Sequence, residues 1–340
     1  MATEEASAPT GLLRFGWSPQ AFHRLSALVT LVMLVIIFAF GNAAFLTVGN
    51  GMTVLLQTAV IGLLGIGMTM VIITGGIDLS VGSVLALAGT VTGMLVKAGV
   101  PVVPAMAVGV AIGAFCGLLN GLIITKMRIT PFVATLGMML IARGTALQLT
   151  GAAPISQLGE AFGVLGNGAL LRVIGEGVNG MSRVVFPGIP FPALLLLVMA
   201  VAASFMLRRR PLGRHIYATG SNEEAARLSG VKVDRTKILA YVMSGALAGL
   251  SGIVLMSRLV TAQPNEGVMY ELDAIAAAVI GGASLMGGVG SISGTMIGAF
   301  IIGVLRNGLN MAGVSAFIQQ IIIGAVVILA VYIDQLRSRR

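Results

Sequence analysis

The sequence predicts an all-α polytopic membrane protein with about ten transmembrane helices. Of its 340 residues, 57% are apolar and only 10% are charged, whereas about 25% of residues are charged in soluble domains. The apolar residues form unbroken runs near the roughly 20 residues of a membrane-spanning helix, not the short alternating segments of an outer-membrane barrel. This composition excludes a soluble enzyme, a secreted disulfide scaffold and a disordered chain.

Ten apolar runs mark the predicted membrane spans. The second and third runs are nearly continuous, and the eighth and ninth share a glycine-rich join. The runs are residues 25–45, 51–73, 80–98, 101–125, 131–150, 189–207, 238–258, 272–288, 290–310 and 315–333.

The Lys and Arg residues predict the orientation of the chain. Ten spans place both termini on one side, and with a cytoplasmic N-terminus 15 of the 21 Lys and Arg residues fall in the cytoplasm. Cytoplasmic loops carry such an excess, so we predict an N-in/C-in topology, and the net charge of +9 calls for no nucleic-acid partner. The chain then divides into a cytoplasmic arm (1–24), one transmembrane domain (25–334) and a basic cytoplasmic tail (335–340).

Two longer polar stretches separate the predicted spans. Residues 151–188 lie outside in this topology and are rich in glycine with few charges. They are compatible with a surface helix or with a re-entrant segment. Residues 208–237 lie inside and are strongly basic.

A glycine-rich segment, TGGIDLSVGS, interrupts the apolar sequence at residues 74–83. Gly75 and Gly76 weaken a helix, and Asp78 or Ser80 can cap the helix that follows. A helix broken at membrane depth is tolerated only inside protein or beside an aqueous cavity, and a carboxylate there is a functional candidate. Asp78 is therefore interpreted as an N-cap near the cytoplasmic interface, as a residue of the translocation pathway, or as both.

A second glycine-rich break, GGASLMGGVG, covers residues 281–290 and carries no charge. A tight helix contact or a hinge is the favoured interpretation. A backbone that lines the solute path is the alternative. The candidate residues of this break are Gly281, Gly282 and Ser284.

Three further polar residues lie in or beside the spans. Glu271 and Asp273 open the eighth span, where acids favour the first turn of a helix. Gln57 is an uncharged hydrogen-bonding candidate, either for a polar pathway or for helix–helix contacts.

The basic loop contains a predicted short helix over residues 222–229. Ser221 and Glu224 have the spacing of a capping box, with Ser221 as the N-cap. Gly230 is placed to end the helix, and Arg227 in its last turn suits the helix dipole.

A helix of about two turns is marginal alone, so we expect it to dock against a surface. Its small side chains, Ala225 and Ala226, would let a partner approach closely. The residues proposed for this contact are Ser221, Asn222, Glu223, Glu224, Ala225, Ala226 and Arg227.

Several catalytic motifs are missing from the sequence. None of the four lysines follows a glycine, so no Walker A loop for ATP occurs. Only two histidines are present, which excludes an H-E-x-x-H protease and disfavours a histidine-ligated metal site. We therefore expect that this chain does not hydrolyse ATP by Walker A chemistry and holds no histidine-ligated metal.

Four stretches give the chain a resemblance to a known family. From about residue 25 to its C-terminus it resembles the membrane-spanning permease of bacterial ABC sugar importers of the ribose type. The stretches are GGIDLSVGS (75–83), PLGRHIYATGSNEEAARLSGV (211–231), AQPNEGVMYELDAIAAAVIGGASLMGGVGSISGT (262–295) and NGLNMAGVSAFIQQIIIGAVVILAVYID (307–334).

The resemblance implies a set of partners and a location. It implies a multi-pass protein of the bacterial inner membrane that forms the translocation path for a monosaccharide. A periplasmic or extracellular binding protein would deliver the sugar, and a separate cytoplasmic ATPase, which binds ATP and Mg, would drive transport. The segment over 211–231 would couple to that ATPase through Asn222 to Arg227. A second copy of the permease or a close homologue would complete the path. Glu271 and Asp273 would then also be candidates to contact the binding protein or sugar hydroxyls. The resemblance further implies that the chain is a transport subunit rather than an enzyme, with no cofactor or metal of its own.

Other transport classes stay open from the residues alone. One is a permease for branched-chain amino acids or another small solute, which a competition panel would separate. Another is an ion-coupled secondary transporter. Asp78 and a weak internal echo suggest it. VIITGG (71–76) is similar to VIGG (279–282), and an Asn-Gly pair recurs at 120–121 and 307–308. The second half of this echo is expected to have inverted orientation, as in the inverted repeats of transporters. A passive channel would show flux without an energy source.

Overall fold

The computed structural model describes residues 19–176 and 182–338. Residues 1–18 of the predicted arm and 339–340 of the predicted tail lie outside the described part. A 3-10 turn, Ala43–Leu46, joins the first two helices. The described part contains thirteen α-helices: α1 Pro19–Gly41, α2 Val48–Ile73, α3 Val81–Lys97, α4 Val102–Lys126, α5 Pro131–Thr150, α6 Glu160–Asn167, α7 Phe191–Arg209, α8 Pro211–Ser221, α9 Glu223–Leu228, α10 Val233–Leu259, α11 Tyr270–Ile280, α12 Ile292–Met311 and α13 Ala316–Ser338.

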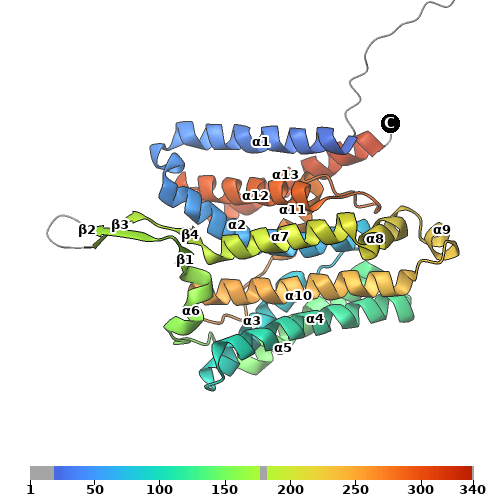
Figure 1. The fold of residues 1–340 in the computed structure, drawn as a ribbon, viewed down its shortest axis with the longest axis horizontal. Coiled ribbons are helices and arrows are strands. Elements are labelled where there is room, and N and C mark those ends of the chain that lie inside the picture. Colours follow the sequence, from blue (N-terminus) through green and yellow to red (C-terminus); the bar gives the residue numbers. More distant parts are fainter. Residues whose placement is uncertain (1–18, 177–181, 339–340) are drawn as a thin grey trace, which may run out of the picture.

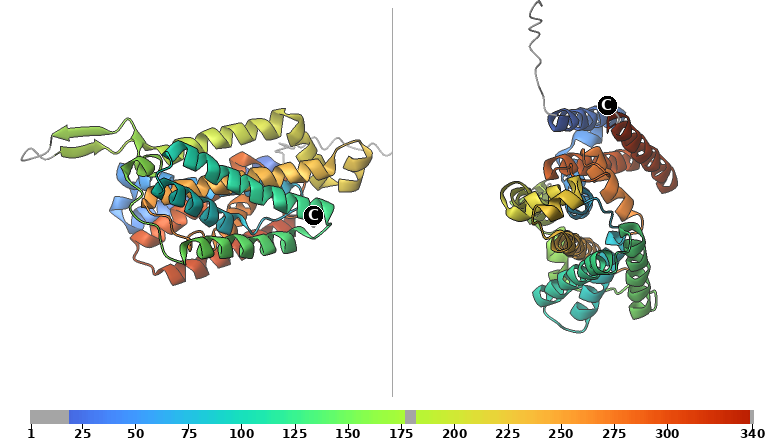
Figure 2. Two further views of the ribbon diagram at one scale, coloured as in Figure 1. Left: turned by 90° about the horizontal axis from the view of Figure 1, so that it is seen from below. Right: turned by 90° about the vertical axis from the view of Figure 1, so that its right-hand side faces the viewer.

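The long helices lie side by side along one direction (Figure 1). Figure 2 shows them end-on, with the blue and red helices on one side and the green and teal helices on the other. Helix α10 packs against α2, α3 and α4. Helix α2 is apolar on all sides, and a helix of that kind belongs in the interior; it is buried along most of its length.

Glycines allow the close packing of α4 on α10. Gly113, Gly117 and Gly121 recur every four residues, on one face of α4. A Cβ on Gly113 would overlap the carbonyl oxygen of Gly245, and one on Gly117 would overlap that of Tyr241. Small residues at this spacing let helix backbones touch in a membrane protein.

The two ends of the bundle differ. We call the end that carries α8 and α9 the α9 end, and the opposite end the hairpin end (Figure 1). At the hairpin end, the described residues between 151 and 190 form α6 and two antiparallel two-stranded sheets. Strand β1 (Ala169–Leu170) pairs with β4 (Ile189–Pro190), and β2 (Val173–Glu176) pairs with β3 (Ser182–Phe186). This stretch was expected to hold a surface or re-entrant helix. It contains one short helix, and its β-branched residues favour the projecting β2–β3 hairpin.

Each predicted span overlaps a helix, but the eighth span is predicted too long. Six helices of the described part are long and apolar enough to cross a membrane, and shorter apolar helices lie at 25–41, 81–97 and 316–329. The eighth span, 272–288, is wrong as a continuous helix, because α11 has only 11 residues and ends at Ile280. Gly282 and Gly287 adopt φ of +88° and +87°, a left-handed backbone that ends the helix and turns the chain.

An inverted orientation does not hold for the VIITGG and VIGG segments of the internal echo. A Cβ on Gly65 of α2 would lie 3.7 Å from the Cβ of Ala277 in α11. Further along both segments, the N–H of Gly288 donates to the carbonyl oxygen of Ile73 at 2.9 Å. Both echoing segments therefore advance toward the α9 end in the same direction.

Candidate functional site

The short helix α9 begins at a different residue from the predicted one. Asn222 is its N-cap: its backbone is extended (φ −157°), and its side-chain oxygen accepts the N–H of Ala225 at 2.9 Å. Ser221 is instead the last residue of α8, so the predicted capping box of Ser221 with Glu224 is wrong. Asn caps as well as Ser, and α8, which the sequence did not predict, continues through Ser221. Gly230, with φ of +83°, follows the end of α9 as expected.

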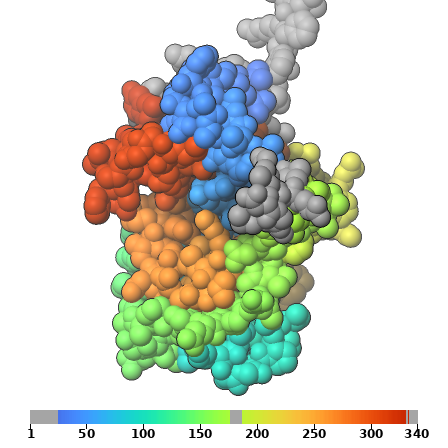
Figure 3. Space-filling model, turned by 90° about the vertical axis from the view of Figure 1, so that its left-hand side faces the viewer, coloured from blue at the N-terminus to red at the C-terminus, as the bar shows by residue number. Residues whose placement is uncertain are grey.

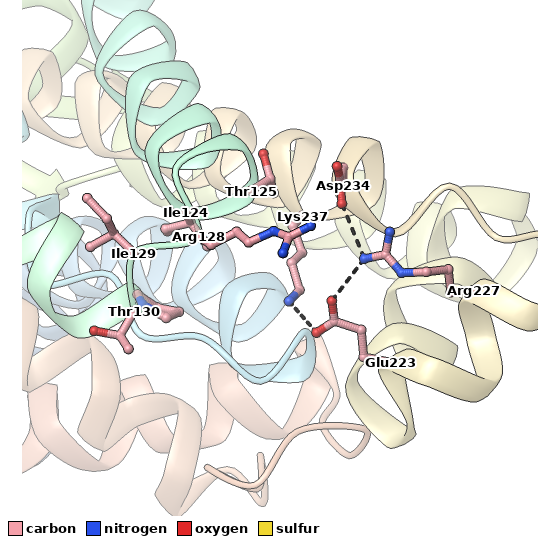
Figure 4. A pocket seen from close by; sticks show the side chains of 10 residues that line it. Ile124, Thr125, Arg128, Ile129, Thr130, Glu223, Arg227, Asp234 and Lys237 are labelled. Atoms are coloured by element: carbon pink, nitrogen blue, oxygen red, sulfur yellow. Dashed lines mark hydrogen bonds and ion pairs between the residues drawn. The ribbon is translucent and has the colours of Figure 1, made fainter.

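Ion pairs hold α9 against the ends of two long helices. Glu223 contacts Lys237 at 2.6 Å and Arg227 at 3.3 Å, and Asp234 contacts Arg227 at 3.4 Å (Figure 4). Asp234 also contacts Lys126 at 3.2 Å. The hydrogen bond from Lys237 lowers the pKa of the Glu223 carboxyl, so Glu223 stays ionised. We call these five residues the α9 brace; they connect α9 to α10 and α4.

The opposite side of α9 is open. Glu224 and Ala225 are exposed, and Leu228 is 85% exposed. We call these three residues the α9 outer face. Ala226 is buried, so it faces the bundle and is unavailable to a partner, contrary to expectation. Within the part of the chain that the structure describes, Glu224 makes no side-chain hydrogen bond or ion pair.

A cavity of about 560 Å³ separates α9 from the end of α4 and the turn that follows it (Figure 4). The α9 brace therefore spans open space rather than a packed core. The cavity is lined by Ile124, Thr125, Arg128, Ile129, Thr130, Pro131, Glu223, Arg227, Asp234 and Lys237.

The carboxylate of Asp78 is buried in the break between α2 and α3. It accepts hydrogen bonds from the backbone N–H of Ser80 at 3.1 Å, from the Ser80 hydroxyl at 2.6 Å and from Ser244 at 2.9 Å. Asn120 of α4 donates to the Ser80 hydroxyl at 2.9 Å. The N-cap of α3 is Ser80, and its side chain makes no capping hydrogen bond. The interpretation of Asp78 as the N-cap is therefore wrong; Asp78 instead fixes the turn before α3 by accepting from Ser80. Because Ser244 lies well inside α10, this turn sits within the bundle rather than at its end.

The two glycines before Asp78 allow the tight turn between α2 and α3. Gly75 has φ of +81°, a conformation that glycine adopts without strain. Gly76 has no room for a side chain, because a Cβ would overlap the hydroxyl of Tyr241.

The two glycine-rich breaks and α8 meet at one place, which we call the glycine junction (Gly75, Gly220, Gly287 and Gly288, around the carbonyl of Ile73). Gly288 donates to the Ile73 oxygen, and a Cβ on Gly220 of α8 would overlap that same oxygen. A Cβ on Gly287 would lie 2.7 Å from the Gly220 oxygen and 3.1 Å from the Gly75 Cα. The helix that precedes α9 is thereby in direct backbone contact with both breaks.

The second break itself is a closed turn. The N–H of Ser284 donates to the Val289 oxygen at 3.0 Å. A Cβ on Gly281 would lie 2.5 Å from the backbone nitrogen of Thr295 in α12, a close helix contact of the kind the sequence favoured. Gly282, at φ +88°, starts the turn.

The remaining predicted residues surround the start of α11. Asp273 is only 2% exposed and pairs with Arg306 at 2.6 Å. A Cβ on Gly82 of α3 would lie 2.5 Å from the Glu271 carboxylate, so the N-terminal ends of α3 and α11 meet inside the bundle. Gln57 lines a separate cavity on the hairpin side.

Sequence reasoning missed Gly220, Lys126, Lys237 and Arg306 as parts of these sites. Their partners are distant in the chain, and no spacing rule relates them. Across residues 19–176 and 182–338, no group of three or more His, Cys, Asp or Glu side chains could hold a metal ion.

Comparison with known proteins identifies the family to which the chain is similar. Residues 50–331 match the family model described as "Branched-chain amino acid transport system / permease component". The chain is 43% identical to the ribose import permease protein RbsC of Bacillus subtilis over 338 residues, 99% of this chain and 100% of the relative. It is 43% identical to the RbsC of Escherichia coli K12 over 312 residues (91% and 92%). It is 34% identical to the xylose transport system permease protein XylH of Haemophilus influenzae over 366 residues (93% and 98%). No solved structure matches.

Proposed function

The chain belongs to the permease family of bacterial ABC importers, and from that premise we propose that it forms the translocation path for a ribose-like monosaccharide. It is a multi-pass membrane transport subunit, not an enzyme. The observation that carries the sugar assignment is the 43% identity to ribose permeases along nearly the whole chain, against 34% to xylose permeases.

We propose ten membrane crossings with both termini in the cytoplasm. The third crossing would consist of the break at 74–80 and α3, and the eighth of residues 260–269 and α11. The α9 end would face the cytoplasm, because Lys and Arg residues gather there. Among them are Lys126, Arg128, Arg208, Arg209, Arg210, Lys232, Arg235 and Lys237.

We propose that α9 couples the permease to a cytoplasmic ATPase subunit, which would bind ATP and Mg. The α9 outer face would contact the ATPase. Asn222 would hold the helix start, Glu223 and Arg227 would fix its angle through the α9 brace, and Ser221 and Ala226 would support it from the bundle side. Movement of α9 would reach both breaks through α8 and the glycine junction.

The pathway assignment is likewise a proposal. Two permease copies, or this chain and a close homologue, would enclose the path, and an external binding protein would deliver the sugar at the hairpin end. The chain itself would hold no cofactor and bind no nucleic acid. The proposed pathway and gate residues are Gly75, Gly76, Asp78, Ser80, Gln57, Glu271, Asp273, Gly281, Gly282 and Ser284.

Reconstitution tests the function. Copurifying chains are first identified after mild-detergent extraction of native membranes, and the complex is placed in liposomes with ATP on the cytoplasmic side. We expect a Walker-type ATPase to copurify and uptake of labelled ribose to require both ATP and the binding protein. Competition by leucine but not by ribose would instead indicate an amino-acid permease. Uptake by this chain alone under an ion gradient would refute the importer.

A further inference from the structure

A polar cavity of about 200 Å³ lies between α2, α10, α11, α12 and α13. Val60, Ile61 and Leu255 provide an apolar wall. Its polar lining consists of Gln57, Arg258, Tyr270, Arg306, Asn310 and Gln319. Arg258 and Asn310 stand next to the last residues of α10 and α12, so the cavity lies toward the hairpin end. Figure 3 views that end, where the blue, orange and red segments that supply the lining meet.

One cation of this lining is held in place by a buried acid. Asp273, which is 2% exposed, accepts from Nη2 of Arg306 at 2.6 Å. The guanidinium charge is thereby balanced, while its Nε is buried and has no hydrogen-bond partner in the part of the chain described. A buried donor without a partner costs roughly 1–3 kcal/mol of stability in general, so such groups persist where something else satisfies them.

The neighbouring side chains also retain unused hydrogen-bonding groups. Gln319 donates its amide to Asn310 Oδ1 at 2.8 Å and to the Val314 oxygen at 2.9 Å. This leaves the Gln319 carbonyl as an acceptor and the Asn310 amide as a donor. Among the described residues, the side chains of Gln57 and Arg258 make no hydrogen bond or ion pair. The cavity thus offers several donors and acceptors that the protein does not use.

This combination fits a neutral polyhydroxyl ligand. Amide side chains both donate and accept, and guanidinium groups donate in pairs, as vicinal hydroxyls require. A volume of about 200 Å³ equals about seven waters at roughly 30 Å³ each, which suits a single sugar ring rather than a disaccharide. An apolar wall with a few convergent polar groups is the usual form of a small-molecule site.

We propose that this cavity is an outer subsite where a monosaccharide binds after release from the binding protein. The proposal rests on the function proposed above and names the residues that would receive the sugar. Gln57, Arg258, Asn310 and Gln319 contact its hydroxyls, and Asp273 acts as a positioning residue for Arg306.

The first test compares Gln57→Leu and Arg258→Met with the wild-type complex in liposomes. Neither side chain makes a hydrogen bond or ion pair with the described protein, so both variants should assemble with the ATPase partner like the wild type. Loss of one hydrogen bond to the sugar corresponds to a roughly three- to tenfold rise in the half-saturating concentration for ribose uptake. Gln148→Leu on α5 is the matched control, since Gln148 is exposed and also has no partner among the described residues; its uptake should not change.

The second test measures occupancy directly. Cys116 is the only cysteine and is buried, so a Cys116→Ala background allows single thiols to be placed at Gln57 or, as the control, at Gln148. A membrane-impermeant thiol reagent applied from the hairpin side should label Gln57→Cys, and ribose with its binding protein should slow that labelling. Labelling of Gln148→Cys should be unaffected by ribose.

The outcomes separate this proposal from the proposed function. Failure of the wild-type complex to take up ribose would refute the function itself. Normal ribose uptake by the wild type together with unchanged half-saturation in both cavity variants, and no protection of Gln57→Cys, would overturn the outer subsite and leave the importer intact.

Discussion

Replacing Gly220 by alanine puts a methyl group where the end of α2 leaves no space. The new Cβ would overlap the Ile73 carbonyl oxygen and lie 2.6 Å from the nitrogen of Gly288 and 2.8 Å from the carbonyl carbon of Ile73. All of these are backbone atoms, which cannot rotate aside as the end of a side chain can. Helix α8 must therefore move away from the glycine junction.

The energetic cost follows from two contributions. Overpacking of a close contact costs about 1–3 kcal/mol. If the displacement also breaks the 2.9 Å hydrogen bond from Gly288 to Ile73, a further loss of about 0.5–1.5 kcal/mol follows. A total of about 1.5–4.5 kcal/mol changes an equilibrium between coupled and uncoupled arrangements by more than tenfold.

Two activities are measured on the same liposomes: ATP-driven ribose uptake and ATP hydrolysis. The thermal unfolding midpoint of the purified chain is measured separately. Gly220→Ala should keep its ATPase partner and hydrolyse ATP, while the sugar transported per ATP falls at least tenfold and the midpoint decreases. The control is Gly144→Ala on α5, where a Cβ meets nothing within 4 Å and alanine favours the helix by up to about 1 kcal/mol. A Gly220→Ala complex with the wild-type midpoint and wild-type coupling would refute the reasoning.

Three further changes test other contacts. The double variant Glu223→Arg/Glu224→Arg should abolish uptake without affecting membrane insertion, and normal uptake by it would contradict the coupling assignment. Glu224→Arg alone should weaken ATPase copurification and leave the α9 brace intact. Asp78→Asn should reduce uptake more than the yield of assembled complex, and equal loss of both would show that Asp78 has only a structural role in the turn before α3. Asp273→Asn leaves Arg306 unpaired and should cost about 3 kcal/mol, seen as a lower unfolding midpoint that Arg306→Met in the same chain restores.

The sequence was sufficient for elements that depend on local composition. Apolar runs located the long helices, because a lipid-facing helix must be apolar along its length. The helix break at Gly75 and Gly76 was also predicted, since glycine pairs interrupt a helix locally, whereas the N-cap of α3 is Ser80 and not Asp78. The β2–β3 hairpin was missed because its β-branched residues sit in a stretch that glycines made ambiguous.

Contacts between distant segments could not be predicted in the same way. Ser221 and Asn222 are equally good N-caps, and only the packing of α8 at the glycine junction decides between them. Likewise, Lys126 and Lys237 contribute to charge counts in the sequence, but only the fold brings them to Asp234 and Glu223. The eighth span was overestimated because an apolar run does not reveal that Gly282 adopts a left-handed backbone.

Helix α11 connects the two sites proposed for this permease. Its 11 residues extend about 16 Å at 1.5 Å per residue. At its C-terminal end, Gly281 and Gly282 begin the turn that carries Gly288 to the glycine junction. At its N-terminal end, Tyr270 lines the outer subsite and Asp273 holds Arg306 there. A rigid helix transmits displacement along its axis, so a shift of α8 against the glycine junction would change the outer subsite. Gly220→Ala should therefore also alter ribose protection of Gln57→Cys, although the two positions lie toward opposite ends of the bundle, and unaltered protection would show that α11 does not link them.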